Sequence, residues 1–320
     1  MEPLVSVIIP CYNAAPWLQA SVASVRAQTW RRCEIIVVDD GSNDGSGELA
    51  DRLAGADLRV LHQPNGGVCS ALNLGLGTAQ GDFIEYLDAD DILDPDKVSI
   101  QIGRLREMPP NWIASGAWAR FEEDPGRVPF VREAIWCDLS PVEWLIASWS
   151  GGGMMHGAAW LSPRAVIDGA GPWDESLTLV NDLEYFTRLV LAGEGVAFCP
   201  DARTYYRSNV TGSLSRSTSL KAWESAFKAT DLSASFLLAR EDSPRVRRAC
   251  AINYQRLVHS AYPYAPRLVA GAEKRIGELG GCELRPGGGA VFQQIMRVAG
   301  WKIARRAQVI GRRLAKGPTQ

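Results

Sequence analysis

The chain contains 320 residues, enough for one large domain or for one domain with an appendage. With 46% hydrophobic and 22% charged residues, its composition excludes a disordered, collagenous or coiled-coil chain. The formal net charge of −2 argues against a globally basic nucleic-acid binder. The charge is uneven, because residues 291–320 carry seven Lys or Arg and no acidic residue, whereas the rest of the chain has a net charge of −9.

The cysteines and the hydropathy pattern indicate the compartment. The seven cysteines are scattered and form no Cys-x-x-Cys pair, which disfavours a disulfide framework or a structural zinc site. No apolar run reaches the roughly 18 residues of a membrane span. The N-terminus lacks the basic and apolar regions of a signal peptide. We therefore expect a protein of the reducing cytoplasm.

The first hundred residues alternate between strand and helix patterns. Short β-branched runs predict strands at Val5–Ile9, Cys33–Val38, Leu58–Leu61 and Phe83–Leu87. Helical patterns follow them at Trp17–Gln28, around Leu49 and Leu53, from Gly66-Gly67 through Leu76, and from Pro95. This alternation predicts right-handed βαβ units, and therefore an α/β fold whose mixed, mostly parallel sheet is flanked by helices.

The remainder of the chain is less regular at first and then helical. Strands are predicted at Ile113–Phe121, His156–Leu161, Val196–Cys199 and Thr204–Arg207, with a helix after Asp182. Beyond about Ser217 the pattern predicts helices at Leu220–Leu238, at Pro244–His259 and in a tail from Val291. The sequence therefore predicts a helical C-terminal extension.

Three polar clusters each follow the carboxyl end of a predicted strand: Tyr12-Asn13, Asp39-Asp40 and Asp88 to Asp91. In open α/β sheets ligands bind at this edge, so we expect the clusters to share one site. Asp88 and Asp90 could hold Mg²⁺ or Mn²⁺ together with substrate phosphates. The alternative is a solvated acidic turn ahead of the next helix.

The other two clusters also allow two interpretations. Asp39 or Asp40 could accept a hydrogen bond from a nucleobase or a ribose hydroxyl, or the pair could form an Asx-turn with a helix cap. Tyr12 could stack on a base or lie in the core beneath the following helix.

Together these motifs resemble the signature of glycosyltransferase family 2. The matching segments are Val5–Asn13, Val37–Ser42, Asn65–Gly67 and Tyr86–Asp91, with Pro172–Leu177 and Asn181-Asp182 in the second half. The resemblance covers about residues 4 to 216 and implies a GT-A fold. In that fold a nucleotide-sugar half, about residues 1–95, joins an acceptor half, about residues 96–216, and residues 217–320 would form the helical extension.

The resemblance also implies roles for individual residues. Asp90 would bind a divalent cation, Mn²⁺ or Mg²⁺, and Asp88 would hold the ribose or share the metal shell. Asp40 would contact the base, with Asp39 supporting it. Asp182 would be the general base. The implied nucleotide-sugar-binding set is Pro10, Tyr12, Asn13, Asp39, Asp40, Gly67, Asn73, Asp88, Ala89 and Arg207; Tyr206, Arg207 and Ser213 resemble the closing segment, where Arg207 could meet the diphosphate.

Two positions depart from the family pattern. The family often has Glu before the catalytic Asp, where this chain has Asn181. It often has Arg before the Asn of the Gly-Gly helix, where this chain has Leu72. A supporting carboxylate is therefore missing, and the identity of the donor stays open.

The family implies an inverting transferase that moves a sugar from UDP or dTDP to a hydroxyl of a polysaccharide, O-antigen or lipid-linked glycan. A non-catalytic nucleotide-sugar-binding scaffold of the same fold is the alternative that Asn181 supports. A nucleotidyltransferase is disfavoured, because Pro10–Asn13 is not a Gly-rich basic phosphate loop.

His156 and the basic tail fall outside these motifs. His156 could act as an acid or base near a cleft, but we interpret it as a structural residue at the start of a strand. Metal binding is disfavoured, because no second ligand lies near it in the sequence. In a helix over 291–316, apolar residues would form one stripe with the basic residues mostly opposite. Such a helix could lie on anionic lipid at the inner face of the cell membrane, or it could pack on the protein with a solvated basic face.

Overall fold

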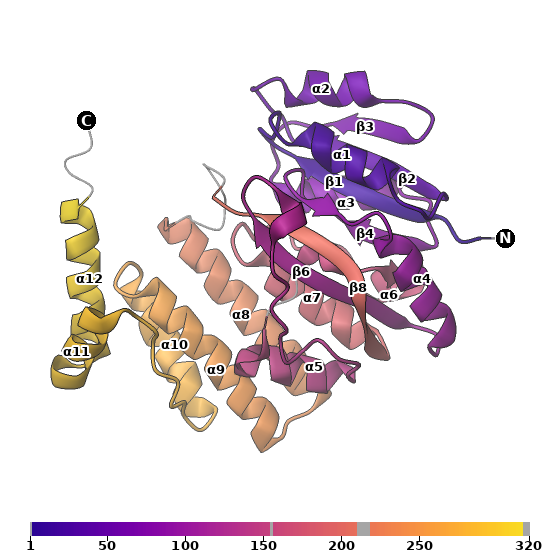
Figure 1. The fold of residues 1–320 in the computed structure, drawn as a ribbon. Coiled ribbons are helices and arrows are strands. Elements are labelled where there is room, and N and C mark those ends of the chain that lie inside the picture. The colour runs from indigo at the N-terminus through magenta and orange to yellow at the C-terminus, as the bar shows by residue number, and fades with distance from the viewer. Residues whose placement is uncertain (1, 154–155, 210–217, 316–320) are drawn as a thin grey trace.

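The computed structural model describes residues 2–153, 156–209 and 218–315 (Figure 1). Its main sheet has the strand order β3-β2-β1-β4-β7. The bounds are β1 Val5–Cys11, β2 Cys33–Asp39, β3 Leu58–His62, β4 Phe83–Tyr86 and β7 Ser162–Pro163. The first four strands run parallel and β7 pairs antiparallel with β4. The predicted α/β fold with a mostly parallel sheet is therefore confirmed.

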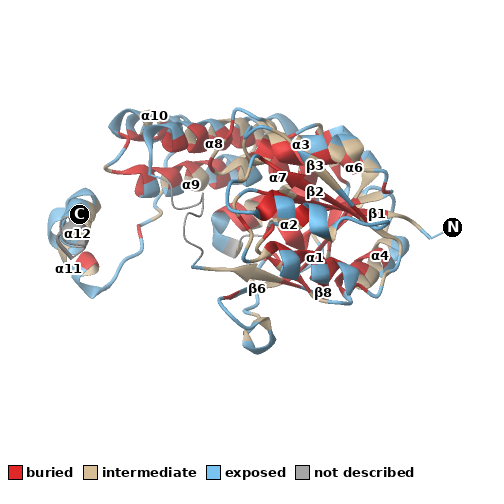
Figure 2. Cartoon of the chain, turned by 90° about the horizontal axis from the view of Figure 1, so that it is seen from above, coloured by how far each residue is buried: buried red, intermediate tan, exposed pale blue. Residues whose placement is uncertain are grey.

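Helices cover both faces of this sheet (Figures 1 and 2). They are α1 Leu18–Arg26, α2 Ser46–Leu53, α3 Val68–Thr78 and α4 Lys97–Glu107. Side chains alternate along a strand, so Val7 of β1 packs in one cluster with α1 and α4 while Ile8 packs in the other with α3. Helix α3 approaches closely because Gly75 has no side chain: a Cβ there would lie 2.5 Å from Ile8 Cγ2.

A second sheet has the order β5-β8-β6, with bounds β5 Ile92–Leu93, β6 Trp112–Phe121 and β8 Gly195–Arg207. The two strands predicted at Val196–Cys199 and Thr204–Arg207 are one continuous strand. The register against β6 shifts between Gly116 and Ala117, where the backbone of Ala202 leaves no room for a side chain at Gly116. This irregularity interrupts the sequence pattern without ending the strand.

The prediction of a strand at His156–Leu161 is wrong. Residues Gly157–Ala159 form a 3₁₀ turn, η3, and Leu161 makes only an isolated bridge to Ala114. The His156 side chain caps this turn by accepting a hydrogen bond from the Ala158 N–H at 3.2 Å. A side-chain acceptor that closes a turn competes with extended pairing, which explains the failure.

The middle and the C-terminal part are helical. The remaining elements are η1 Pro125–Arg127, α5 Pro141–Ala147, η2 Ser148–Gly152, α6 Arg164–Ala170, α7 Asn181–Ala192, α8 Leu220–Arg240, α9 Pro244–Ala261 and α10 Pro266–Glu278. The predicted helices after Asp182 and at 220–238 and 244–259 are confirmed. Helices α5, α6 and α10 have no counterpart in the prediction.

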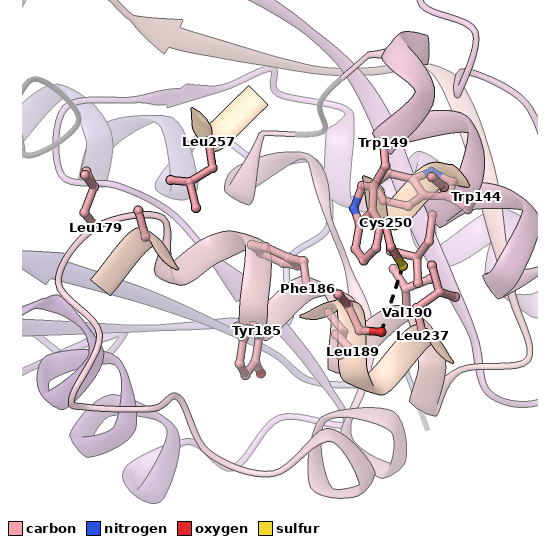
Figure 3. Close-up of a cluster of buried hydrophobic side chains, with 14 of the residues drawn as sticks. Trp144, Trp149, Leu179, Tyr185, Phe186, Leu189, Val190, Leu237, Cys250 and Leu257 are labelled. Atoms are coloured by element: carbon pink, nitrogen blue, oxygen red, sulfur yellow. Dashed lines mark hydrogen bonds between the residues drawn. The ribbon is translucent and has the colours of Figure 1, made fainter. Parts of the chain in front are cut away.

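One apolar core runs from the region around α5 and α7 into these C-terminal helices. Figure 3 shows side chains of α7, among them Phe186 and Leu189, in a cluster with Trp144, Leu237 and Cys250. Burial of this kind contributes about 25 cal/mol per Å² of apolar surface. Helices α8 and α9 therefore complete the core beneath α7, whereas the division of the chain at residue 216 stays a prediction.

The tail consists of two helices, α11 Ala290–Ala299 and α12 Trp301–Ala315, instead of one. The break falls at Gly300, whose φ of +81° lies in the left-handed region. Figures 1 and 2 show that the pair projects from the body beyond α9 and α10. Trp301 packs edge-on against His259, and Arg305 donates a hydrogen bond to the His259 carbonyl. None of the helices described has both the length and the hydropathy to cross a membrane.

The junction between α9 and α12 makes stability depend on pH. Burial, together with the nearby Arg305 guanidinium, lowers the pKa of His259 to about 4. In the unfolded chain a histidine titrates near about 6.5, so the unfolded state binds more protons between these values and stability falls as pH drops through this range. Buried carboxyls with raised pKa values, such as Glu85, act in the opposite direction, so the contribution of His259 is measured as a difference between two proteins. We expect the melting temperature of the wild type to fall relative to that of the His259→Gln variant between about pH 7 and pH 5. Scanning calorimetry of both proteins measures this difference; a difference that does not change with pH would contradict the prediction.

Candidate functional site

A fully buried carboxylate, Asp91, stands at the centre of the acidic cluster that follows β4. Its Oδ1 accepts the backbone N–H of Arg207 at 2.7 Å, at the end of β8. Its Oδ2 lies 2.9 Å from Nε2 of His156, which precedes η3. The turn after β4, the last residue of β8 and the segment before η3 therefore meet at one side chain.

Two further carboxylates surround this point. The Asp88 side chain is 55% exposed on one side, but protein atoms crowd it elsewhere; this desolvation and the charge of Asp91 raise its pKa to about 6. Desolvation and the charges of Asp91 and Asp88 raise the pKa of half-buried Asp90 to about 7. Carboxylates that repel one another in this way form a site where a divalent cation is stabilised.

The residues present fit such a cation. Ligand atoms of Asp88, Asp91 and His156 lie within 4.8 Å of one another. Asp91 Oδ2 is buried, and its close partner among the described residues is His156 Nε2 at 2.9 Å, so an acceptor position on this oxygen remains for a cation. Hard oxygen ligands of this kind suit Mg²⁺ or Mn²⁺. Asp90, the metal ligand that the sequence suggests, borders this group without belonging to it.

His156 is placed differently from its interpretation in the sequence. Asp91 and Asp88 lie 2.9 and 3.9 Å from its Nε2, so potential ligands are near it, and it begins a 3₁₀ turn rather than a strand. Burial alone would lower the pKa of His156, but the charges of Asp91, Asp88 and Asp90 outweigh that effect and raise it.

The hydrogen bond at Nδ1 determines whether His156 presents a donor or an acceptor to the carboxylates. Because Nδ1 accepts the Ala158 N–H, the neutral ring carries its proton on Nε2. That nitrogen therefore faces the two carboxylates as an N–H rather than as a lone pair. A cation could bind Nε2 only if the proton moved to Nδ1, which would break the hydrogen bond from the Ala158 N–H. The carboxylates are therefore the better ligands.

Asp182 lies at the start of α7. Its side chain is exposed on one side, but protein atoms crowd it elsewhere, and this desolvation raises its pKa. Its Oδ1 accepts the N–H of Leu183 at 2.8 Å. Its charge contributes to the raised pKa of Asp88, so the two carboxyls are close enough to interact electrostatically. The preceding Val180 has a φ of +60°, a conformation that costs a β-branched residue roughly 1–3 kcal/mol and that occurs mainly at functional sites.

At the carboxyl end of β2, the Asp40 carboxylate fixes a loop. It is buried and accepts hydrogen bonds from Gln63 Nε2 and from the backbone N–H groups of Gly66 and Gly67, at 2.7, 2.7 and 2.9 Å. Gly67 has a φ of +90°, which favours glycine. Asp40 therefore joins the end of β2 to the start of α3.

Asp39 lies behind Asp40, closer to the surface helix α2. It accepts the Ser42 N–H and faces His62 Nδ1 at 3.1 Å, whose other nitrogen faces Asp51. Hydrogen bonds to Asp51 and Asp39 raise the pKa of His62. Asp39 is thus held in place by groups outside the site.

The first strand ends beside this loop. Pro10 pairs with Val38 in the sheet, and Tyr12 leaves the sheet with its ring 52% exposed. Asn13 has a φ of +51°, and its side chain accepts the Asn43 N–H. Tyr12 is therefore a free aromatic surface next to a rigid turn, and not a core residue.

Three other residues of the expected set are engaged with the protein. Asn73 exchanges hydrogen bonds with the backbone of Trp173 and donates to Glu175, so its amide holds the loop before α7. The Arg207 guanidinium donates to the carbonyls of Asp90 and Glu122. Ala89 is buried in the turn between the acidic residues. Ser213 lies outside the described residues.

Sequence comparison places the N-terminal part in a known group. Residues 6–151 match the family model described as glycosyl transferase family 2. The chain is 31% identical over 192 residues to an uncharacterized glycosyltransferase of Rickettsia felis, covering 59% of this chain and 31% of the relative. It is 36% identical over 133 residues to glycosyltransferase GlyG of Streptococcus pneumoniae, covering 41% of this chain and 44% of GlyG. The chain thus spans less than half of these two relatives.

Structure comparison supports the same fold. The crystal structure of Staphylococcus aureus TarS 1–349 in complex with UDP-GlcNAc superimposes with a TM-score of 0.61 at 16% identity, covering 88% of this chain and 93% of that chain. The resemblance to glycosyltransferase family 2 that the sequence predicts is confirmed over residues 6–151, and the GT-A fold is confirmed as well. Both sequence relatives are described as glycosyltransferases.

The raised pKa values of the acidic cluster predict how metal binding depends on pH. A cation must displace protons from Asp88 and Asp90, whose pKa values are about 6 and about 7. We expect the affinity for Mn²⁺ to be about tenfold or more weaker near about pH 5.5 than near about pH 7.5. Isothermal titration calorimetry at both pH values measures the affinity. The control variant Asp168→Asn on α6 leaves the acidic cluster unchanged and should show the wild-type pH dependence. An affinity independent of pH would contradict this assignment.

Proposed function

We propose that this protein is an inverting glycosyltransferase that moves a sugar from a nucleoside diphosphate to an acceptor hydroxyl. One observation carries the proposal: in a GT-A fold, the acidic turn at the end of β4 places the Asp88 carboxylate within electrostatic reach of Asp182 at the start of α7. Metal-supported departure of a diphosphate and removal of a proton from the acceptor need these two sets of groups.

The donor end consists of groups suited to a nucleoside. The exposed Tyr12 ring offers a stacking surface, and Pro10 and Asn13 shape the turn around it. Asp40 has acceptor capacity beyond its three hydrogen bonds, since a carboxylate has about four lone-pair positions, and a base N–H could take one. The complex of TarS with UDP-GlcNAc supports a UDP donor, and dTDP has the same hydrogen-bonding edge.

The metal would be Mn²⁺ or Mg²⁺, held by Asp88 and Asp90 with Asp91 beside them. When bound, such an ion neutralises charge on the departing diphosphate. The chain positions these ligands from behind: Arg207 fixes the Asp90 carbonyl, and Asp91 fixes the backbone of Arg207.

Asp182 is the proposed general base. Desolvation by the surrounding protein atoms raises its pKa, which makes the carboxylate a stronger base, and the Leu183 N–H holds one carboxylate oxygen. A single base acting opposite the leaving group gives inversion at the anomeric carbon. Asn181 donates to Cys69 Sγ at 3.2 Å, so it packs against α3 and leaves Asp182 to act alone.

The proposed acceptor is a polysaccharide, O-antigen or lipid-linked glycan, met at the inner face of the cell membrane. The chain's similarity to bacterial glycosyltransferases supports a glycan acceptor. A non-catalytic scaffold of the same fold is the second candidate, favoured by the missing carboxylate at Asn181.

Donor binding should be visible without an acceptor. A ligand that binds only the folded state raises the melting temperature, so we expect UDP or dTDP to raise it in the presence of Mn²⁺. The Asp90→Ala variant should lose the metal-dependent part of the shift, whereas the exposed control Asp168→Ala should keep it. A folded protein that shows no shift with any nucleoside diphosphate at saturating ligand would contradict the proposal.

Turnover separates the transferase from the scaffold. Removing a general base typically costs about 10²–10⁴-fold in rate. We expect Asp182→Asn to lower the rate of sugar release from the donor by this factor, with donor affinity unchanged; Asp168→Asn is the matched control. Release of the sugar is followed by chromatography of the nucleotide product. A wild-type protein that binds donor and never turns it over would favour the scaffold.

A further inference from the structure

The two tail helices carry an unusual share of the exposed apolar side chains. Nine large hydrophobic residues are exposed in the part of the chain that the structure describes, and four of them are Val291, Val298, Ile303 and Ile310. Val298 is 91% exposed. Soluble surfaces rarely gather such residues without a partner.

Helix α12 has an inner face that is bound to the body. Trp301 packs against Tyr262 with ring centroids 5.2 Å apart, Lys302 pairs with Glu273 at 2.7 Å, and Arg305 donates to the His259 carbonyl at 3.0 Å. Several basic side chains of the tail are therefore used for docking, as one of the two sequence interpretations requires. These three contacts fix the orientation of α12 about its own axis.

The opposite face is apolar and open. Ile303, Ala307 and Ile310 follow one another at i, i+4 and i+7, so they share one stripe, and all three are exposed. We call these three residues the outer face of α12. Because the inner face is anchored, the outer face cannot turn inward to bury itself.

Charge indicates what this face meets. Residues 291–320 carry seven basic and no acidic residues, whereas the rest of the chain has a net charge of −9. An anionic surface would attract the tail and repel the body, which orients the molecule. A second copy of the chain would bring two strongly basic tails together, so self-association through this face is disfavoured.

We propose that the outer face of α12, together with the exposed valines of α11, binds the surface of an anionic lipid bilayer. The helix lies in the interface with its apolar stripe towards the acyl chains, while exposed basic side chains of the tail that do not dock on the body, such as Arg297, reach the headgroups. The binding does not depend on the proposed transferase activity; if both hold, the enzyme meets its lipid-linked acceptor at the membrane.

Flotation of the full chain with vesicles tests this. We expect binding to phosphatidylcholine vesicles that contain phosphatidylglycerol and much weaker binding to phosphatidylcholine alone. Each basic residue near an anionic surface strengthens binding roughly fivefold, so binding should weaken as salt rises. Wild-type protein that stays with neither kind of vesicle at low salt overturns the proposal.

Matched variants distinguish lipid binding by the outer face of α12 from non-specific adsorption to vesicles. The double variant Ile303→Asp with Ile310→Asp should weaken binding about tenfold or more. The control, Val131→Asp with Leu220→Asp, makes the same chemical change at two exposed residues outside the tail and should bind like wild type. Equal binding by the two double variants overturns the proposal.

Two further measurements identify the remaining outcomes. Circular dichroism should give both variants the wild-type melting temperature, because all four residues are exposed. Analytical ultracentrifugation detects the competing occupant: a wild-type dimer that the tail variant dissociates, without flotation of either protein, overturns lipid binding in favour of a second copy. A wild-type protein that floats with the anionic vesicles but shows no UDP-induced thermal shift would contradict only the proposed function.

Discussion

The geometry of the site depends on the buried carboxylate of Asp91. A carboxylate without solvent is tolerated only where donors or cations replace water, and here the Arg207 N–H and the His156 ring do so. These two partners belong to segments far apart in the sequence. Asp91 thus holds the end of β8 and the start of η3 against the turn that carries Asp88 and Asp90.

A buried ion pair holds the elements that carry this region. Glu85 of β4 and Lys97 of α4 form a fully buried ion pair, and Lys97 also donates to the Trp160 carbonyl. Burial raises the pKa of Glu85 to about 7 and lowers that of Lys97, so each charge depends on the other. Helix α4, strand β4 and the segment after η3 are therefore fixed together, and His156 takes its position from them.

Local patterns were enough to predict the first half of the fold. Strands such as Val5–Ile9 are apolar on both faces and end at polar residues, and parallel strands bring those ends together. Predictions failed where distant contacts decide. No local signal shows that His156 meets Asp91 and Asp88, or that a shift opposite Gly116 lets β8 continue.

The two halves of the site are linked by aromatic and amide contacts that set the separation of their carboxylates. Asn73 on α3 holds both backbone groups of Trp173, whose ring stacks on Tyr185 of α7 at 3.8 Å. The hydroxyl of Tyr185 lies 2.8 Å from that of Tyr86, the last residue of β4. In the proposed reaction, base and leaving group must be held within a narrow range of positions, because small displacements cost large factors in rate. This path joins the strand that precedes the acidic cluster to the helix that begins with Asp182, so it keeps the two in register through packing rather than through any group that touches substrate.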